Sequence, residues 1–287
     1  MNMNERFILK VKELERVKNS TLFYPCSGND LLLPIELFSP YVTDFWFVDR
    51  GYFSPGHQDT KDFGLDVSAD KQPLALVLGK DTRYEYVENS RKIDGPPSWR
   101  FENRDISPCI LSETYRHKET HREIRIHLRR GYGFSAFRSE IKELGVFFYR
   151  GDSWGEGGSG NLWLEEGHMD EVCNKLIDCG LIVSDGSDGS PRCGYREGGV
   201  YKEMWKYSWK EVSMEIDALV ASFKSFTDSK GRILKCVGYA GRRYGPTMIW
   251  QVMKPAKPTT LSEVSMSKNK KEDADNKQFD FELKKED

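Results

Sequence analysis

The chain has 287 residues, of which 43 are basic and 45 are acidic, and its formal net charge is −2. This near-neutral balance argues against broad electrostatic adhesion to nucleic acid or to an anionic membrane surface. Aromatic residues make up 13% of the chain, which is typical of a packed globular protein rather than a disordered one. A chain of this length can bury a core that needs no disulfides.

Residues 1–20 carry charges throughout, and no apolar run approaches the ~20 residues that a membrane span requires. The sequence therefore predicts neither a signal peptide nor a transmembrane helix, and we expect a cytoplasmic protein. The six cysteines include no C-x-x-C pair, so reduced and mostly structural thiols are expected. They are Cys26, Cys109, Cys173, Cys179, Cys193 and Cys236.

The first elements are predicted from apolar spacing. Apolar residues from Phe7 to Val17 recur at helical intervals and predict an amphipathic helix that ends near Asn19. Short apolar runs at 22–24 and 45–48 are typical of strands buried on both faces of a parallel sheet. Residues 31–38 between them predict a short helix.

The middle of the chain predicts further strands at 74–78, 109–115 and 122–128. The polar turn 118–121 pairs the last two strands in a hairpin. We expect a β-rich insertion at about 80–140.

The later elements alternate between strands and helices. In order they are a strand at 146–149, a glycine-rich loop at 151–160, a helix at 169–177 stopped by Gly180, a strand at 181–186, a helix at 200–226, and two strands, "ILKCVGYAG" and "PTMIWQVM". The two final strands predict an antiparallel hairpin. After Lys254 the composition becomes charged and poor in apolar residues, so we expect a domain over 1–254 and a disordered tail over 255–287.

This alternation predicts an α/β layered domain, in which ligands bind beyond the carboxyl ends of the strands. The turn after the first buried strand, "YPCSGND", lies there and offers small and polar residues to a ligand. Asp49 ends the next strand, 21 residues after Gly28, at the spacing expected of an acidic partner for ribose hydroxyls. The alternative is an ordinary tight turn and a strand-end cap. The turn has one glycine and lacks the G-x-G-x-x-G pattern.

The order of elements resembles the class I S-adenosylmethionine-dependent methyltransferase superfamily. The closing strands and the junction "LIDCGLIVSDG" carry the resemblance, which spans about 5–254. It implies a Rossmann-like three-layer sandwich, with a mostly parallel sheet closed by a C-terminal antiparallel hairpin. It also implies that S-adenosylmethionine is bound, with its methionine part over Tyr24, Pro25, Ser27 and Gly28 and its ribose on Asp49.

The segment "RGDSWGEGGSG" follows the predicted strand at 146–149 and reaches the same edge of the sheet. Asp152 or Glu156 in this segment is a candidate general base or cation ligand, if partial burial raises its pKa. The alternative is a surface loop whose acidic side chains are solvated.

Other candidates have simpler interpretations. Polar strand and turn positions are favoured over a metal site for His117, His121 and His127, so no metal is predicted. No His or acidic residue adjoins Cys26 in sequence to activate it as a nucleophile. Arg242 and Arg243 either contact an anionic substrate or are solvated.

The tail contains "KQFDFEL", which resembles the bacterial sliding-clamp-binding peptide through Gln278, Phe279, Phe281 and Leu283. The sequence therefore supports two alternative functions. One is an S-adenosylmethionine-binding methyltransferase-like enzyme with an unidentified acceptor. The other is a non-catalytic adaptor or binding protein of the same fold, whose tail docks a partner such as a sliding clamp.

Overall fold

The structure is a computed structural model, and it describes residues 7–9, 11–28, 30–50, 52, 83–95, 108–150, 163, 166–184, 225–228, 230–242 and 246–255. The chain divides into two compact units, 1–254 and 255–287, and every described helix and strand lies in the first.

The described elements alternate along the chain. The strands are β1 (Phe7–Leu9), β2 (Thr21–Pro25), β3 (Asp44–Asp49), β4 (Tyr84–Tyr86), β5 (Lys92–Asp94), β6 (Cys109–His117), β7 (Glu123–Arg130), β8 (Leu144–Tyr149), β9 (Leu176–Ser184), β10 (Ser225–Thr227), β11 (Ile233–Arg242) and β12 (Pro246–Met253). The helices are α1 (Val11–Glu15), α2 (Leu32–Phe38), α5 (Gly133–Glu140) and α6 (Glu166–Lys175). Within the described part, none of these helices is long and apolar enough to cross a bilayer.

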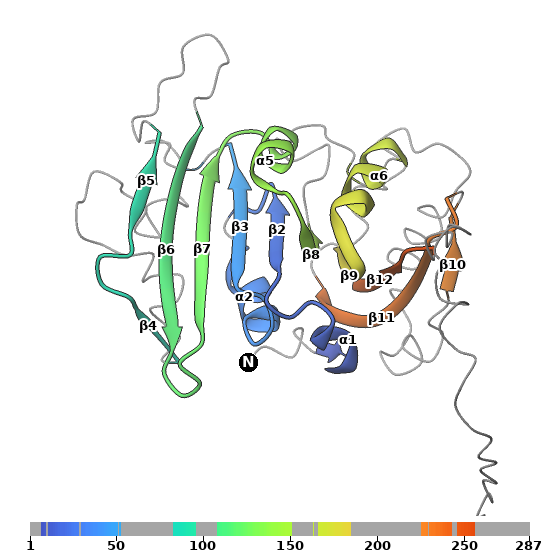
Figure 1. Ribbon diagram of the computed structural model, residues 1–287, viewed down its shortest axis with the longest axis horizontal. Helices are drawn as coiled ribbons and strands as arrows, with labels where there is room; N and C mark the ends of the chain where they lie inside the picture. The colour runs from blue at the N-terminus through green and yellow to red at the C-terminus, as the bar shows by residue number, and fades with distance from the viewer. Residues whose placement is uncertain are drawn as a thin grey trace, which may run out of the picture. The chain divides into compact units, whose positions relative to one another are not determined.

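The twelve described strands belong to one mixed sheet (Figure 1). Ten of them follow the order β1-β11-β12-β9-β8-β2-β3-β7-β6-β4, while β10 pairs with β11 and β5 pairs with β6. The central strands β9, β8, β2, β3 and β7 run parallel. Counted by their appearance in the chain, they follow the order third, second, first, fourth, fifth from β7 to β9. This is the order of a doubly wound, Rossmann-like sheet, and the order of the strands reverses between β2 and β8.

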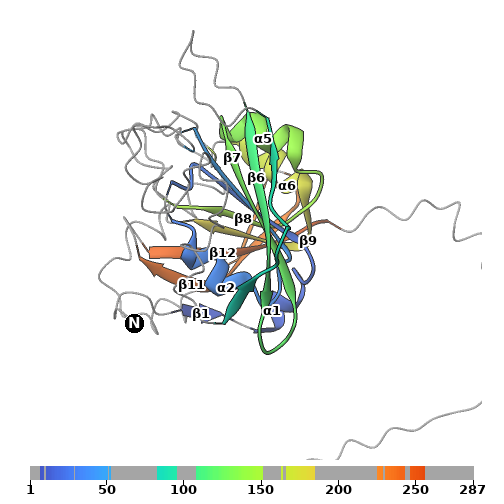
Figure 2. The same ribbon diagram turned by 90° about the vertical axis from the view of Figure 1, so that its left-hand side faces the viewer.

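Antiparallel strands flank the parallel centre. On one side β12 pairs antiparallel with both β9 and β11, so β11 again runs parallel to β9. On the other side β6 pairs antiparallel with β7, which confirms the hairpin predicted at 109–128. The second strand of that hairpin, β7, is itself a member of the parallel centre through its pairing with β3. Figure 2 shows the twist of the sheet between β6 and β12.

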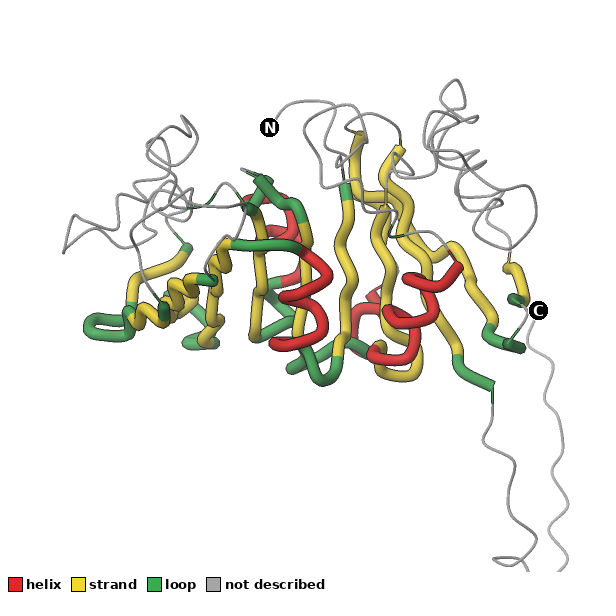
Figure 3. The backbone as a smooth tube through the Cα atoms, turned by 90° about the horizontal axis from the view of Figure 1, so that it is seen from above, coloured by secondary structure: helices red, strands yellow, loops and turns green. Residues whose placement is uncertain are grey.

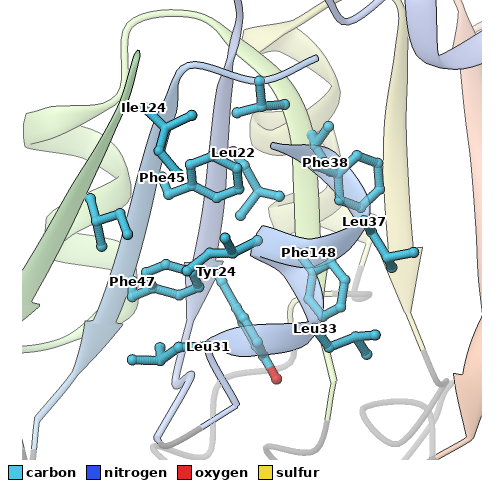
Figure 4. Close-up of a cluster of buried hydrophobic side chains, with 14 of the residues drawn as sticks. Leu22, Tyr24, Leu31, Leu33, Leu37, Phe38, Phe45, Phe47, Ile124 and Phe148 are labelled. Atoms are coloured by element: carbon cyan, nitrogen blue, oxygen red, sulfur yellow. The ribbon is translucent and has the colours of Figure 1, made fainter. Parts of the chain in front are cut away.

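Alternate side chains of the central strands enter two cores. Leu22 and Tyr24 of β2 belong to the core that α1 and α2 cover, whereas Phe23 belongs to the core that α5 and α6 cover. Figure 3 shows the strands as one yellow layer with the helices in red. Figure 4 shows the first core, in which Leu22, Tyr24, Phe45, Phe47 and Phe148 pack against Leu33, Leu37 and Phe38 of α2. The result is a helix-sheet-helix arrangement, with helices on both faces of the parallel strands.

Two predicted helix boundaries are wrong. Phe7–Leu9 forms β1 instead of the start of a helix, because its backbone pairs with Gly238–Ala240 at the edge of β11. The helix α6 ends at Lys175, and β9 begins at once and runs through Gly180, which the sequence suggested as a helix stop. Cys179 has a φ of 62°, and the β8–β9 register shifts there, so a bulge takes up the residues expected to end the helix.

Helix α5 was not expected from the sequence. It begins at Gly133, and its Ala136 and Phe137 are buried. Lys175 Nζ donates hydrogen bonds of 2.6 Å and 2.5 Å to the carbonyl oxygens of Phe137 and Ile141 at the end of the helix. A cation in this position satisfies carbonyl groups that the last turn leaves without partners.

Several predicted elements lie outside the described residues. They are the strand at 74–78, the loop at 151–160, most of the helix at 200–226, and the tail from 256. The last residues of that predicted helix, Ser225 and Phe226, belong to β10, which pairs with β11.

Candidate functional site

The turn after β2 folds back onto β3. Cys26 and Gly28 have φ values of 54° and 50°, so the backbone enters the left-handed region twice within three residues. The backbone N–H of Ser27 donates to the carbonyl oxygen of Val48 over 3.1 Å, and that of Asp30 donates to Ser27 over 2.9 Å. These bonds place the turn beside the end of β3.

Gly28 and Asp49, which the sequence proposed as partners in one site, are in contact. Asp49 is the last residue of β3, and its Oδ2 accepts a 3.0 Å hydrogen bond from the backbone N–H of Gly28. Apart from Gly28 itself and its chain neighbours, no described residue has a heavy atom within 4 Å of the position that a Cβ on Gly28 would take. The turn is thus held by a carboxylate, and its glycine faces no other described residue at contact distance.

Tyr52 also holds the turn, through hydrogen bonds of its hydroxyl group. Its O–H donates to the carbonyl oxygen of Gly28 over 2.8 Å, and its oxygen lies 2.7 Å from Oγ of Ser27. Burial raises the pKa of Tyr52 well above its ordinary value, and the negative charge of Asp49 raises it further. Tyr52 therefore stays protonated and acts as a hydrogen-bond donor.

A buried ion pair joins the turn to the end of β8. Arg150 follows β8 directly, and its Nε and Nη2 donate to Oδ2 and Oδ1 of Asp30 over 2.9 Å and 2.8 Å. The hydroxyl of Tyr24 lies 2.9 Å from Asp30 Oδ2 and 2.6 Å from the carbonyl oxygen of Arg150. Both are acceptors, so Tyr24 shares its proton between them. This link crosses the point where the strand order reverses.

The structure brings together only some of the residues predicted to bind the cofactor. Tyr24 lies in the core beneath α2, whereas the Cβ of Pro25 lies 2.8 Å from the position that a Cβ on Gly133 would take, on the α5 side. Ser27, Gly28 and Asp49 meet at the carboxyl edge. Asp152 and Glu156 lie outside the described residues, as do Arg243 and the tail residues Gln278, Phe279, Phe281 and Leu283.

Sequence reasoning missed Asp30, Tyr52 and Arg150. Arg150 follows the predicted strand 146–149, so the rule that sites form at carboxyl ends of strands was a usable signal. Asp30 lies in the quoted turn, but its partner comes from 120 residues further along the chain. No periodicity or motif marks Tyr52.

The histidines make local contacts. His127 Nδ1 lies 2.7 Å from Oγ of Ser112, its Nε2 lies 3.7 Å from Oδ1 of Asp44, and its ring stacks on Trp46 at 4.2 Å. His117 accepts a hydrogen bond from the backbone N–H of Thr120. In the part of the chain that the structure describes, no group of three or more His, Cys, Asp or Glu side chains is placed to hold a metal ion.

A comparison with solved structures finds a distant likeness. No family model matches the sequence, and no curated protein matches it. A solved structure of precorrin-6y C5,15-methyltransferase from Geobacter metallireducens GS-15 is similar, with a TM-score of 0.33 and 11% sequence identity. The match covers 85% of this chain and 87% of the other. A likeness of this degree assigns neither a family nor an activity.

Proposed function

We propose that the protein binds S-adenosylmethionine at the carboxyl edge of β2 and β3 and transfers its methyl group to an acceptor that remains to be identified. The observation that carries this proposal is the contact between Asp49 and Gly28 beside the reversal of the strand order. Doubly wound sheets bind nucleotide-like ligands at this place, with a carboxylate on the ribose.

Two features of the described residues fit an adenosyl ligand. A carboxylate has about four lone-pair positions, so Asp49 can hold the turn through Gly28 and also accept hydrogen bonds from ribose hydroxyls. The described residues leave the space beside Gly28 free, so they allow a ligand to approach the backbone of the turn closely. When bound, S-adenosylmethionine supplies an electrophilic methyl group on a positively charged sulfur. The chain's own task is then to bind and orient the two reactants.

We also include Asp152 and Glu156 in the proposed site. They follow Arg150, whose side chain lies at the carboxyl edge of the sheet. Where the acceptor loses a proton on methylation, we assign its removal to one of these two carboxylates.

Calorimetric titration with S-adenosylmethionine and S-adenosylhomocysteine tests the proposal. We expect binding by the wild-type protein and an affinity at least about tenfold lower in Asp49→Ala, since a hydrogen bond to a charged group is lost. Asp44→Asn is the matched control, because Asp44 lies at the opposite end of the same strand and its loss should leave affinity unchanged. Folded protein that gives no heat with either ligand at millimolar concentration would refute the proposal.

A non-catalytic binding role is the second candidate, and one observation favours it. The polar groups of the turn already bind one another: Gly28 is bound on both sides by Asp49 and Tyr52, and Tyr24 by Asp30. The turn is therefore held without a ligand. In this case the fold is a scaffold, and the tail segment Gln278–Leu283 docks a partner such as a sliding clamp. Loss of clamp binding on replacing Gln278, Phe279 and Leu283 with alanine is the required result, and unchanged affinity rejects the motif.

A further inference from the structure

Ser112, His127 and Asp44 lie side by side on three neighbouring strands, outside the proposed adenosyl site. His127 of β7 pairs directly with Ser112 of β6, and Asp44 is the first residue of β3. Nδ1 of His127 lies 2.7 Å from Oγ of Ser112, and its Nε2 lies 3.7 Å from Oδ1 of Asp44. The described part of the chain leaves all three residues partly exposed. One imidazole ring thus connects a hydroxyl group with a carboxylate.

These two contacts determine which nitrogen of His127 carries the hydrogen. A carboxylate only accepts hydrogen bonds, so the charge of Asp44 favours the hydrogen on Nε2. Nδ1 is then left with a lone pair that accepts the hydroxyl hydrogen of Ser112. Burial would raise the pKa of Asp44, but hydrogen bonds to its oxygens, first of all from His127, outweigh this effect and lower it. Asp44 is therefore ionised at neutral pH, and His127 can act as a base toward Ser112.

The surroundings of His127 also favour a positive charge on its ring. Trp46 of β3 pairs directly with His127, and their rings stack with centroids 4.2 Å apart and an angle of 15° between the planes. The face of an aromatic ring attracts a cation, and Asp44 adds a full negative charge. Both neighbours therefore stabilise the imidazolium that forms when His127 takes a proton.

A lysine lies on the other side of Ser112. Lys92 of β5 pairs directly with Ser112, so the two side chains leave the same face of the sheet at adjacent positions. Lys92 is exposed, and its flexible stem allows its ammonium group to reach the oxygen of a substrate bound at Ser112. Across the neighbouring strands β7, β6 and β5 (Figure 1), the sheet thus aligns a base, a hydroxyl nucleophile and a hydrogen-bond donor for an oxyanion.

We propose that Ser112 and His127, with Asp44 as their positioning residue, form a second catalytic site that hydrolyses carboxylic esters. Oγ of Ser112 bonds to the carbonyl carbon of the ester while its proton moves to Nδ1 of His127. Lys92 donates a hydrogen bond to the resulting oxyanion. The bond to the alcohol then breaks, and the alcohol leaves with the proton from His127. Water attacks the acyl group on Ser112 through the same proton transfers, which releases the carboxylic acid and restores the serine.

Diisopropyl fluorophosphate tests the nucleophile, because its phosphorus bonds to an activated serine oxygen as fluoride leaves. We expect the wild-type protein to gain one diisopropylphosphoryl group. No Lys or Arg occurs between Arg104 and Arg116, so this group should appear in the tryptic peptide 105–116. Fragmentation should place it on Ser112 rather than on Ser107. Ser112→Ala should abolish the labelling, and His127→Gln should slow it at least about 100-fold, because the general base is lost.

The role of Asp44 is tested by two substitutions that separate charge from size. Asp44→Asn removes the charge and should slow labelling at least about tenfold. Asp44→Glu keeps the charge and should restore most of the rate. The affinity of both variants for S-adenosylhomocysteine should equal that of the wild-type protein, because this site and the adenosyl site are separate.

Hydrolysis of p-nitrophenyl acetate tests turnover. The kcat/KM of the wild-type protein should exceed that of Ser112→Ala and of His127→Gln at least about 100-fold. Lys92→Gln should lower kcat/KM at least about tenfold, because the oxyanion loses a donor.

His117→Gln and Ser139→Ala are matched controls for the two substitutions at the catalytic residues. Nδ1 of His117 accepts a hydrogen bond of 3.2 Å from the backbone N–H of Thr120, and Oγ of Ser139 donates one of 2.9 Å to the carbonyl oxygen of Ser135. Neither contact pairs a serine with a histidine. Both variants should label and hydrolyse at rates within about twofold of the wild-type protein.

Several results would overturn the site. They are no labelling of folded wild-type protein under conditions that label trypsin, labelling confined to residues other than Ser112, equal rates in the wild-type protein and His127→Gln, and labelling of Ser112 without ester hydrolysis. If His127→Gln fails to fold, the position of the label on the wild-type protein still decides. Neither assay contains an adenosyl ligand, so the outcome is independent of the proposed function.

Discussion

The backbone N–H of Gly28 donates a 3.0 Å hydrogen bond to Oδ2 of Asp49, which joins the turn after β2 to the end of β3. Replacing Asp49 should therefore weaken the fold as well as ligand binding. Asp49→Ala removes the acceptor, and we expect the free energy of unfolding to fall by about 1–3 kcal/mol. Asp49→Asn keeps an oxygen for Gly28 and should cost less. Urea denaturation of the three proteins measures the difference, and equal losses in both variants would show that the contact contributes nothing.

Tyr52 gives the protein a distinctive response to alkaline pH. Burial, followed by the charge of Asp49, raises its folded-state pKa, so the native protein keeps a proton that the unfolded chain releases near pH 10. The stabilising contribution is fully present below about pH 10 and declines above it, by up to about 1.4 kcal/mol per pH unit.

Tyr52→Phe should therefore flatten the loss of stability between about pH 10 and 11. The same variant should cost about 1 kcal/mol at neutral pH, because the hydrogen bond to Gly28 is lost. Urea midpoints measured from pH 8 to 11 give both quantities. Tyr115, whose pKa is also raised by burial, is present in both proteins and cancels in the comparison. Parallel pH profiles for the two proteins would contradict the assignment to Tyr52.

Gly133 of α5 packs closely against Pro25, which ends β2, and against Trp163. A Cβ at this position would lie 2.8 Å from Cβ of Pro25 and 2.9 Å from Cζ2 of Trp163. Gly133→Ala should therefore lower the free energy of unfolding by about 1–3 kcal/mol through overpacking. Gly167→Ala is the control, because a Cβ there meets no other described residue within 4 Å and alanine favours the helix α6. Thermal denaturation that ranks the two variants in the opposite order would refute this packing.

The central strands were readable from the sequence because they are short apolar runs buried on both faces. Residues 22–24, 45–48 and 146–149 lie within β2, β3 and β8. At two places, strand pairing determined the structure where the local sequence pattern predicted a helix or a helix end. Phe7–Leu9 has helical spacing but lies against β11, and the residues around Gly180 form a bulge in β9. The spacing of Phe134, Phe137 and Ile141 is compatible with a helix at α5. The face that this helix buries is set by its packing near β2 and β3 and cannot be deduced from that spacing.

The site could be predicted only in part. Local spacing along two strands was enough to pair Gly28 with Asp49. Tyr24 and Asp30 both contact Arg150, which follows β8 and lies more than a hundred residues further along the chain, and no local pattern predicts such a contact. The sequence therefore indicated the contact of Gly28 with Asp49, whereas the contacts of Tyr24 and Asp30 with Arg150 emerge only from the tertiary structure.

The most direct test of the central claim is photochemical crosslinking with radiolabelled S-adenosylmethionine, followed by tryptic digestion. No Lys or Arg occurs between Lys18 and Arg50, so β2, its turn, α2 and β3 fall within a single peptide, residues 19–50. We predict that this peptide carries most of the label and that excess S-adenosylhomocysteine abolishes it. Label confined to other peptides, or labelling that excess S-adenosylhomocysteine leaves unchanged, would contradict a site at the carboxyl edge of β2 and β3.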